Sequence, residues 1–140
     1  MTGEDWFARE QLHRAAQDGD MKEMRRLLDA GFPPWLFDDL SCTPLHYAVQ
    51  GEHYHAAELL LGAGAQVNAH EQDRIGETPL CLAVQGDYPE MVGLLLRHGA
   101  DPDIPGWMEL TARLRARKRK DEAGRQIAAL LARHAPVLTR

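Results

Sequence analysis

Histidine and cysteine are the residues of this chain with the most distinctive chemistry, and their spacing does not favour a metal site. The chain has seven histidines and two cysteines. His53 and His55 lie two positions apart, which on a helix turns their side chains about 200° away from each other. Cys42 and His46 have a plausible spacing for a metal, but His46 belongs to a motif that recurs along the chain. We therefore predict no metal centre and no cofactor.

Catalysis by a nucleophile is also not favoured. A reactive cysteine needs surroundings that lower its pKa, a base and a third group that orients the base, and we find no such set around Cys42 or Cys81. The zinc-protease, P-loop and serine-hydrolase motifs are absent from the sequence. Residues 62–64 (Gly-Ala-Gly) are interpreted as the end of a helix, not as a nucleotide-binding loop. We predict that the protein is not an enzyme.

The elements that would position these side chains repeat along the chain. Residues 41–51 match residues 76–86 at an offset of 35, and each copy is followed by an apolar helix that ends in a glycine. An upstream copy and a degenerate copy near residues 129–135 extend the pattern. A repeat of this length indicates units that bury their cores by stacking on one another.

Each repeat is predicted to be a pair of short helices. Thr43 and Thr78 are good N-cap residues, and a proline follows each at the first helical position, where its missing N–H costs little. The first helix of each repeat is about two turns long. The second helices are expected to end at Gly31, Gly64 and Gly99, each in the left-handed conformation.

These motifs resemble those of the ankyrin-repeat family. The resemblance is carried by Thr-Pro-Leu-His-Tyr-Ala at residues 43–48 and by Gly-Ala-Gln-Val-Asn-Ala at 64–69, and it covers roughly residues 8–135. It implies an all-α solenoid of about four helix-turn-helix repeats joined by short β-hairpin-like fingers, and hydrogen bonds from His46 to the backbone. A single domain over 1–140 is expected, with repeats at about 5–37, 38–72, 73–102 and 103–136.

The ends and the fingers depart from the family pattern. Large apolar residues occupy the finger at 32–42, so that Trp35 and Phe37 either cover the first repeat or anchor a partner. In the last repeat Met108 and Glu109 stand where Thr-Pro would be expected, and Arg113 falls at the buried alanine position. We expect a lengthened first helix there, with about six residues inserted before the second.

Charge is divided unevenly along the chain. Residues 1–112 hold 19 acidic residues and 7 Lys or Arg, a balance of −12, whereas residues 113–140 hold 2 and 9, a balance of +7. A protein that binds the acidic body is expected to be basic. Six of the residues 113–120 are Arg or Lys. This segment is a solvated helix face, a site of protein or intramolecular electrostatics, or a nucleic-acid patch, and the sequence leaves the three open.

The family resemblance implies binding of a partner protein in a concave surface formed by the fingers and the first helices. We expect an adaptor or an inhibitor, for instance a bacterial immunity-type neutraliser of a basic protein. The alternative is a nucleic-acid-associated or nuclear regulatory factor that uses residues 113–120. The candidate partner-binding residues are Trp35, Phe37, Asp38, Asp39, Leu40, Cys42, Gln50, Arg74, Ile75, Glu77, Gln85, Tyr88 and Trp107.

The location of the protein is inferred from absent signals. The first residues are acidic and lack an apolar signal region, and no apolar run approaches membrane-spanning length. Two thiols do not make a disulfide framework. We expect a cytoplasmic protein that does not contact a membrane and is a monomer when unbound.

Overall fold

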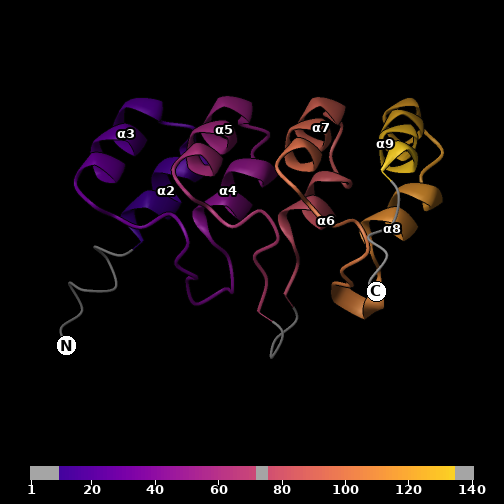
Figure 1. Cartoon of the computed structure of the whole chain (residues 1–140), viewed down its shortest axis with the longest axis horizontal. Helices are drawn as coiled ribbons and strands as arrows, with labels where there is room; N and C mark the ends of the chain where they lie inside the picture. Colours follow the sequence, from indigo (N-terminus) through magenta and orange to yellow (C-terminus); the bar gives the residue numbers. More distant parts are fainter. Residues whose placement is uncertain (1–9, 72–75, 135–140) are drawn as a thin grey trace. The chain divides into compact units, whose positions relative to one another are not determined.

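The computed structural model describes residues 10–71 and 76–134, whose regular secondary structure is entirely helical (Figure 1). None of these residues lies in a strand, and the prediction of an all-α repeat fold is confirmed. The elements are α2 (Gln11–Asp18), α3 (Met21–Asp29), α4 (Pro44–Gln50), α5 (Tyr54–Gly62), α6 (Pro79–Ala83), α7 (Pro89–Arg97), the 3-10 helix η1 (Trp107–Glu109), α8 (Ala112–Lys118) and α9 (Glu122–Arg133).

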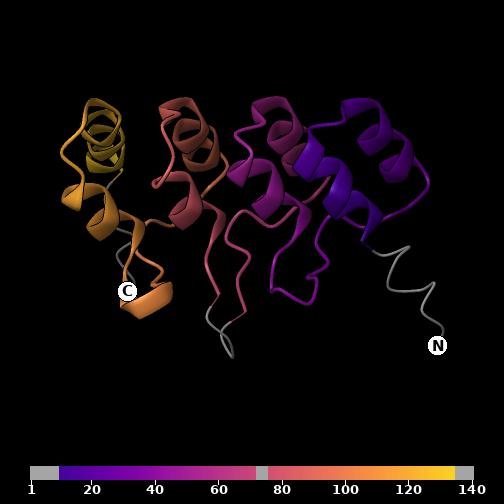
Figure 2. The ribbon, with the colours of Figure 1, turned by 180° about the vertical axis from the view of Figure 1, so that it is seen from behind.

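The chain divides into two compact units, each built from two helix-turn-helix repeats. In unit 1 (Met1–Gln66), α2 pairs with α3 and α4 with α5, and the repeats stack α2 on α4 and α3 on α5. In unit 2 (Val67–Arg140), α6 pairs with α7 and α8 with α9, and α6 stacks on α8 and α7 on α9 (Figure 2). Leucines at the centre of these contacts, such as Leu45 and Leu60 in unit 1 and Leu80 and Leu95 in unit 2, are fully buried. Each contributes about 1.5–3 kcal/mol by leaving water.

Threonine starts the first helix of three repeats. The Thr43 N–H donates to Nδ1 of His46 (2.9 Å), the backbone contact that the family resemblance implies for this histidine. The Thr78 hydroxyl accepts the Cys81 N–H (3.1 Å), and the Thr111 hydroxyl accepts the Leu114 N–H (3.2 Å). Each bond satisfies a donor that the first turn of a helix would otherwise leave unpaired.

Glycine ends the second helix of three repeats, as predicted. Gly31, Gly64 and Gly99 have φ angles of 97°, 107° and 92°, a region that other residues adopt only with strain. The residue after each glycine donates its N–H back into the helix, as Phe32 does to the Leu27 carbonyl (3.0 Å). This bond satisfies a terminal carbonyl and turns the chain toward the next finger.

The predicted form of the last repeat is wrong. α8 has seven residues, as α4 has, and three residues separate it from α9, as three separate α4 from α5. There is therefore no lengthened first helix and no six-residue insertion, and the extended element is α9, with 12 residues. Because Thr111 is the N-cap, the buried alanine position belongs to Ala116, and Arg113 takes the place of Leu45 and Leu80.

Candidate functional site

The first finger, residues 32–42, is organised around the carboxylate of Asp38. Its Oδ1 accepts the N–H groups of Leu40 (2.9 Å) and Cys42 (3.0 Å), and its Oδ2 accepts the hydroxyl of Tyr47. The Asp38 N–H in turn donates to the Cys42 carbonyl (2.8 Å), which closes the loop. Asp38, predicted to contact a partner, thus holds the finger in one conformation.

Apolar side chains of the first finger differ in how far they are covered. The Phe37 ring centroid lies 6.4 Å from that of His46, and the ring is partly covered. Trp35 is half exposed (50%), close to Gly64 at the end of α5, and Leu40 is 75% exposed. His13 Nε2–H donates to the Leu36 carbonyl between them (2.8 Å), which ties the finger to α2. The finger therefore presents Trp35 and Leu40 outward on a fixed backbone.

A small acidic hollow lies beside Leu40. It has a volume of about 360 Å³ and is lined by Glu10, Asp38, Asp39, Leu40 and Tyr47. Burial, the hydrogen bond to Asp38 and the nearby negative charges raise the pKa of the Tyr47 hydroxyl well above its ordinary value. The hydroxyl therefore stays protonated and keeps donating to Asp38.

Both thiols are held in their protonated form. Burial, together with the charge of Asp38, raises the pKa of Cys42 to about 11. Burial also raises the pKa of Cys81, which lies between the carbonyls of Ile104 and Leu110 (both 3.9 Å from Sγ). A thiol with a raised pKa is a poor nucleophile at neutral pH, so these environments do not activate either cysteine.

The third finger, residues 103–110, is a tight turn that presents two large apolar side chains. The Gly106 N–H donates to the Leu110 carbonyl (3.0 Å), and the Glu109 N–H donates back to Gly106 (3.0 Å). Met108 and Glu109 have φ angles of 59° and 62°, in the left-handed region that side chains disfavour. Trp107 is 48% exposed and Met108 71% exposed at this turn.

An ion pair between Arg115 and Glu77 stabilises the third finger. The guanidinium of Arg115 lies 2.8 Å from one carboxylate oxygen of Glu77 and 3.0 Å from the other. The same guanidinium donates to the carbonyls of Leu110 (3.3 Å) and Trp107 (3.4 Å). Gly106 fits against this pair because a Cβ there would lie 2.3 Å from Glu77 Oε1. Glu77, predicted to contact a partner, therefore holds the finger in place.

Basic residues 113–120 do not form one continuous charged face. The side chains of Arg113, Arg115 and Arg119 are only 10–19% exposed and bind carboxylates of unit 2. Arg113 also donates to the carbonyls of Leu131 (2.7 Å) and His134 (2.5 Å) at the end of α9. The exposed basic residues of the segment are Arg117, Lys118 and Lys120.

A comparison with known protein families shows to which family the chain belongs. A model for ankyrin repeats (3 copies) matches residues 12–106, which is more than half of the chain. The chain belongs to the ankyrin-repeat family. Ankyrin repeats generally mediate protein–protein interaction. No helix in the described part of the chain is long and apolar enough to cross a membrane.

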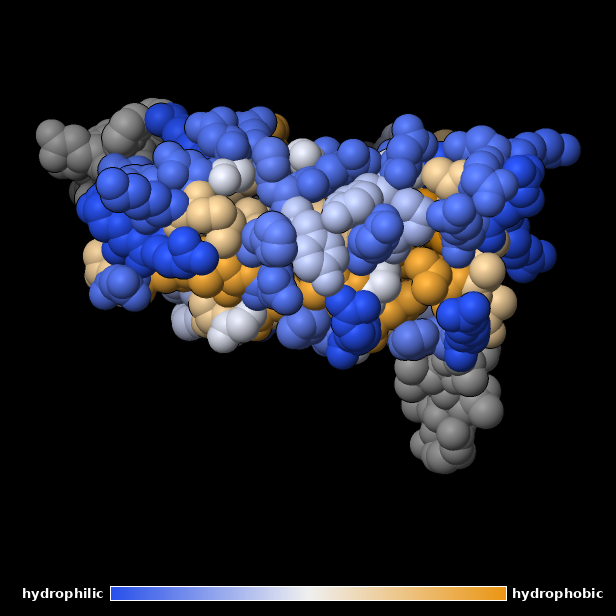
Figure 3. All heavy atoms as spheres, turned by 90° about the horizontal axis from the view of Figure 1, so that it is seen from above, coloured by the Kyte–Doolittle hydropathy of each residue, from blue (hydrophilic) through white to orange (hydrophobic). Residues whose placement is uncertain are grey.

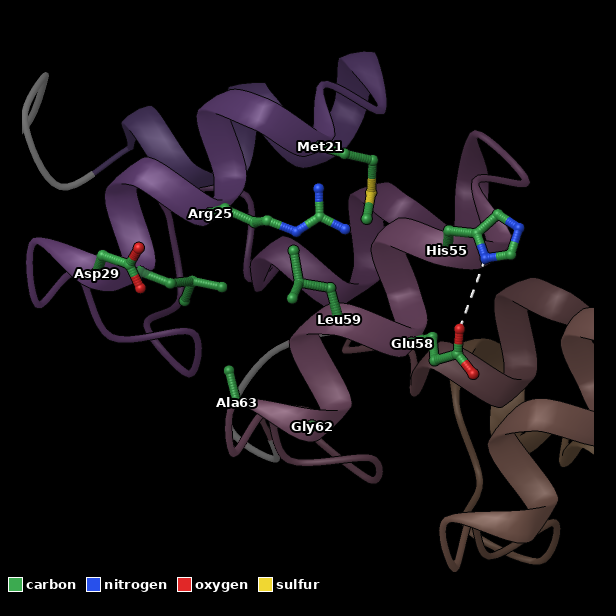
Figure 4. A pocket seen from close by; sticks show the side chains of 9 residues that line it. Met21, Arg25, Asp29, His55, Glu58, Leu59, Gly62 and Ala63 are labelled. Atoms are coloured by element: carbon green, nitrogen blue, oxygen red, sulfur yellow. Dashed lines mark ion pairs between the residues drawn. The ribbon is translucent and has the colours of Figure 1, made fainter.

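The second helices of the first two ankyrin repeats enclose another hollow, away from the first finger. It has a volume of about 830 Å³ between α3 and α5, and Figure 4 shows Arg25 reaching across it toward Leu59. The imidazole of His55 lies 3.5 Å from Glu58 at its edge. Seen from this side of the molecule, hydrophilic side chains predominate and hydrophobic ones form narrow strips (Figure 3). The hollow is lined by side chains of both charges, so it favours no single partner chemistry.

The other predicted contact residues lie on or near the first helices. Gln50 is the exposed last residue of α4, and Gln85 is exposed just after α6, where its side-chain amide donates to the Cys81 carbonyl (3.3 Å). Tyr88 is the partly exposed N-cap residue of α7. Arg74 and Ile75 lie outside the described residues. Which of these residues contact a partner stays a prediction.

The sequence alone does not predict the exposed turn that follows Trp107. The sequence places Met108 and Glu109 where Thr-Pro would be expected, whereas in the structure they form the exposed turn of the third finger. The true N-cap, Thr111, lies 33 residues after Thr78, within the repeat period. That spacing was the signal that would have placed the turn before the helix.

Proposed function

We propose that this ankyrin-repeat protein binds a basic partner protein through its fingers, as an adaptor or an inhibitor. One observation carries the proposal. The described residues include five exposed large hydrophobic side chains, and four of them, Trp35, Leu40, Trp107 and Met108, lie in the first and third fingers. Exposed apolar side chains gathered in loops are typical of interaction sites, and aromatic residues are enriched among those that contribute most to binding.

Charge supports a basic partner. Carboxylates accompany the exposed apolar residues in both fingers, as Asp39 and Glu10 do beside Leu40 and Glu109 does beside Met108. The chain as a whole carries a formal charge of −5, and three of the arginines in 113–120 already bind carboxylates of unit 2. An acidic surface attracts a basic protein and speeds the encounter. A neutraliser of a basic protein is the sharpest form of this proposal.

Rigidity of the fingers favours binding of a folded partner surface. Asp38 fixes the first finger by accepting hydrogen bonds from two backbone N–H groups and from Tyr47. Arg115 fixes the third finger through Glu77 and two carbonyls. A surface that is already ordered loses little conformational entropy on binding, so more of the contact energy remains as affinity. The mechanism is therefore occlusion or scaffolding by two fingers, each preformed within its own unit, without catalysis.

Capture from a lysate of the source organism tests the proposal. Immobilised protein is compared with two variants, Leu40→Ser, which removes an exposed apolar side chain, and Asp39→Asn, which removes a charge. Asp38 is left intact because its loss would disturb the finger itself. We expect the wild-type protein to retain a basic protein, and the variants to retain at least tenfold less of it, since 1.4 kcal/mol changes an affinity tenfold.

Gly62→Arg, in the hollow between α3 and α5, is the matched control. Gly62 ends α5, a Cβ there meets nothing within 4 Å, and the next repeat has Arg97 at the same position. The substitution should therefore fold normally and fill the hollow between α3 and α5. Capture that survives in Leu40→Ser and disappears in Gly62→Arg would place the partner on the hollow and refute the finger proposal.

A further inference from the structure

The third finger forms one wall of an open pocket in unit 2. The pocket has a volume of about 750 Å³, and its described lining includes Glu71, Ile104, Pro105, Trp107, Met108 and Glu109. The wall of the pocket is apolar and aromatic, and the carboxylates of Glu71, Asp103 and Glu109 stand around it. The described lining residues include no lysine or arginine. This combination differs from the hollow between α3 and α5, which Arg25 enters.

The pocket is held open by bonds beneath it. Arg115 binds Glu77 and donates to the Trp107 carbonyl, so the backbone that carries the indole ring is fixed from the core side. The turn from Gly106 to Leu110 closes on itself through backbone hydrogen bonds and places Met108 and Glu109 in the left-handed region. Such backbone is strained and persists only where the surroundings enforce it.

The charge of the lining residues determines which kind of group can occupy the pocket. Asp103 already accepts the Nε–H of Arg113 (2.9 Å), so among the described lining residues the carboxylates left for an occupant are those of Glu71 and Glu109. A phosphate or an acidic peptide would be repelled by these carboxylates. A guanidinium group is planar and cationic, stacks on an indole face and donates to carboxylates at its edge. It therefore matches both features of the pocket at once.

We infer that this pocket receives an arginine side chain of the partner protein, stacked on Trp107 and paired with Glu109 and Glu71. The inference rests on the proposed function and specifies the partner group that the third finger recognises. Arginine is favoured over lysine because an ammonium ion is more strongly hydrated and has no planar face. The first finger, with Trp35 and Leu40, contacts the partner separately and does not form this pocket.

A peptide titration followed by NMR tests the inference directly. The probes are three blocked pentapeptides, Gly-Gly-Xaa-Gly-Gly, in which Xaa is arginine, lysine or citrulline, and the signal is the indole N–H of Trp107. Citrulline keeps the shape of arginine and lacks its charge. We expect the arginine peptide to bind at least tenfold more tightly than the citrulline peptide, with lysine between them. Equal binding of arginine and citrulline would overturn the inference.

Substitutions assign the binding to the pocket. Glu109→Gln preserves size at the strained backbone position and removes the charge, and it should weaken arginine binding about tenfold. Trp107→Leu, followed by backbone amide signals of the third finger, should abolish it, whereas Trp35→Leu in the first finger should leave it unchanged. Arginine binding that persists in Trp107→Leu would refute the inference. Amide spectra of each variant verify that α8 and the finger remain folded.

The outcome separates this inference from the proposed function. If the arginine peptide does not bind, but capture of the partner still depends on Leu40, the inference is wrong and the proposed function stands. If capture depends on neither finger, both are wrong. Capture that is lost equally in Leu40→Ser and in Trp107→Leu, together with arginine selectivity, supports both.

Discussion

Asp38 and Asp39 are adjacent residues of one type in the first finger, and the structure gives them different surroundings. Asp38 accepts two backbone N–H groups and the Tyr47 hydroxyl, whereas the Asp39 side chain is exposed at the edge of the acidic hollow. The sequence could predict an acidic finger but not this division, because the division depends on where the chain turns at Ser41, whose φ angle is 63°. The same holds for Glu77, whose partner Arg115 is 38 residues away.

Cys42 provides the first prediction at the residue scale. Its pKa is raised to about 11 by burial and by the charge of Asp38, so below pH 9 its thiolate fraction is about a hundredfold lower than that of a free thiol. We expect its alkylation by iodoacetamide at pH 8 to be slower than that of N-acetylcysteine by a similar factor. The rate should keep rising until the pH reaches about 11. Peptide mapping by mass spectrometry follows Cys42 separately from Cys81.

Unfolding the chain in urea provides the control. Without the folded finger the Cys42 thiol should regain the pKa and the alkylation rate of a free cysteine. The raised pKa of the Cys42 thiol also makes the free energy of unfolding depend on pH. A folded-state pKa above the unfolded value contributes stability that is complete below pH 9 and is lost as the pH rises toward 11. Alkylation of the folded protein at the rate of N-acetylcysteine would contradict the burial of Cys42 in a fixed finger.

The helices were largely predictable because their signals are local. Thr43 with Pro44, and Thr78 with Pro79, start α4 and α6 as expected, since a cap and the following residue act within one turn. The start of the last repeat has no strong local signal, because Ala112 stands where the second and third repeats have proline, the clearest marker of a helix start. Arg113 then took a leucine position and bonds the end of α9, a long-range contact with no local signal.

Arg119 connects two neighbouring repeats, so replacing it tests what holds these elements together. Its guanidinium joins the third and fourth repeats by donating to the carbonyls of Val84 (2.9 Å) and Gly86 (2.5 Å) and by binding Asp87 and Asp121. Lysine cannot reproduce this planar set of donors. We expect Arg119→Lys to lower the free energy of unfolding by about 2 kcal/mol, measured by urea denaturation.

Arg117→Lys, two residues earlier in α8, is the matched control. Arg117 is exposed, so this substitution should change stability by less than about 0.5 kcal/mol. If both variants unfold at the same urea concentration, Arg119 does not connect the two repeats in solution. A loss confined to Arg119→Lys would show that part of the basic segment stabilises unit 2.

At the scale of the whole molecule, the uneven charge of the chain is partly resolved inside unit 2. The basic segment supplies Arg113, Arg115 and Arg119 to carboxylates of its own unit, and it exposes Arg117, Lys118 and Lys120. Three exposed cations beside an acidic body make a weak site for nucleic acid, whose affinity comes mainly from neutralised phosphates. The sequence could not distinguish these roles, because all six residues look equally basic along the chain.

Replacing the exposed cations tests which role the segment has. The variant Arg117→Gln, Lys118→Gln, Lys120→Gln loses three positive charges, so the formal charge falls from −5 to −8. Its stability should be nearly unchanged because these side chains are exposed. Binding of a basic partner should be as fast or faster, since the field that steers it becomes more negative, and the difference should fade as salt is added. Neither protein should bind a labelled DNA duplex in about 0.15 M salt. Duplex binding by the wild-type protein that the variant loses would instead establish the nucleic-acid alternative.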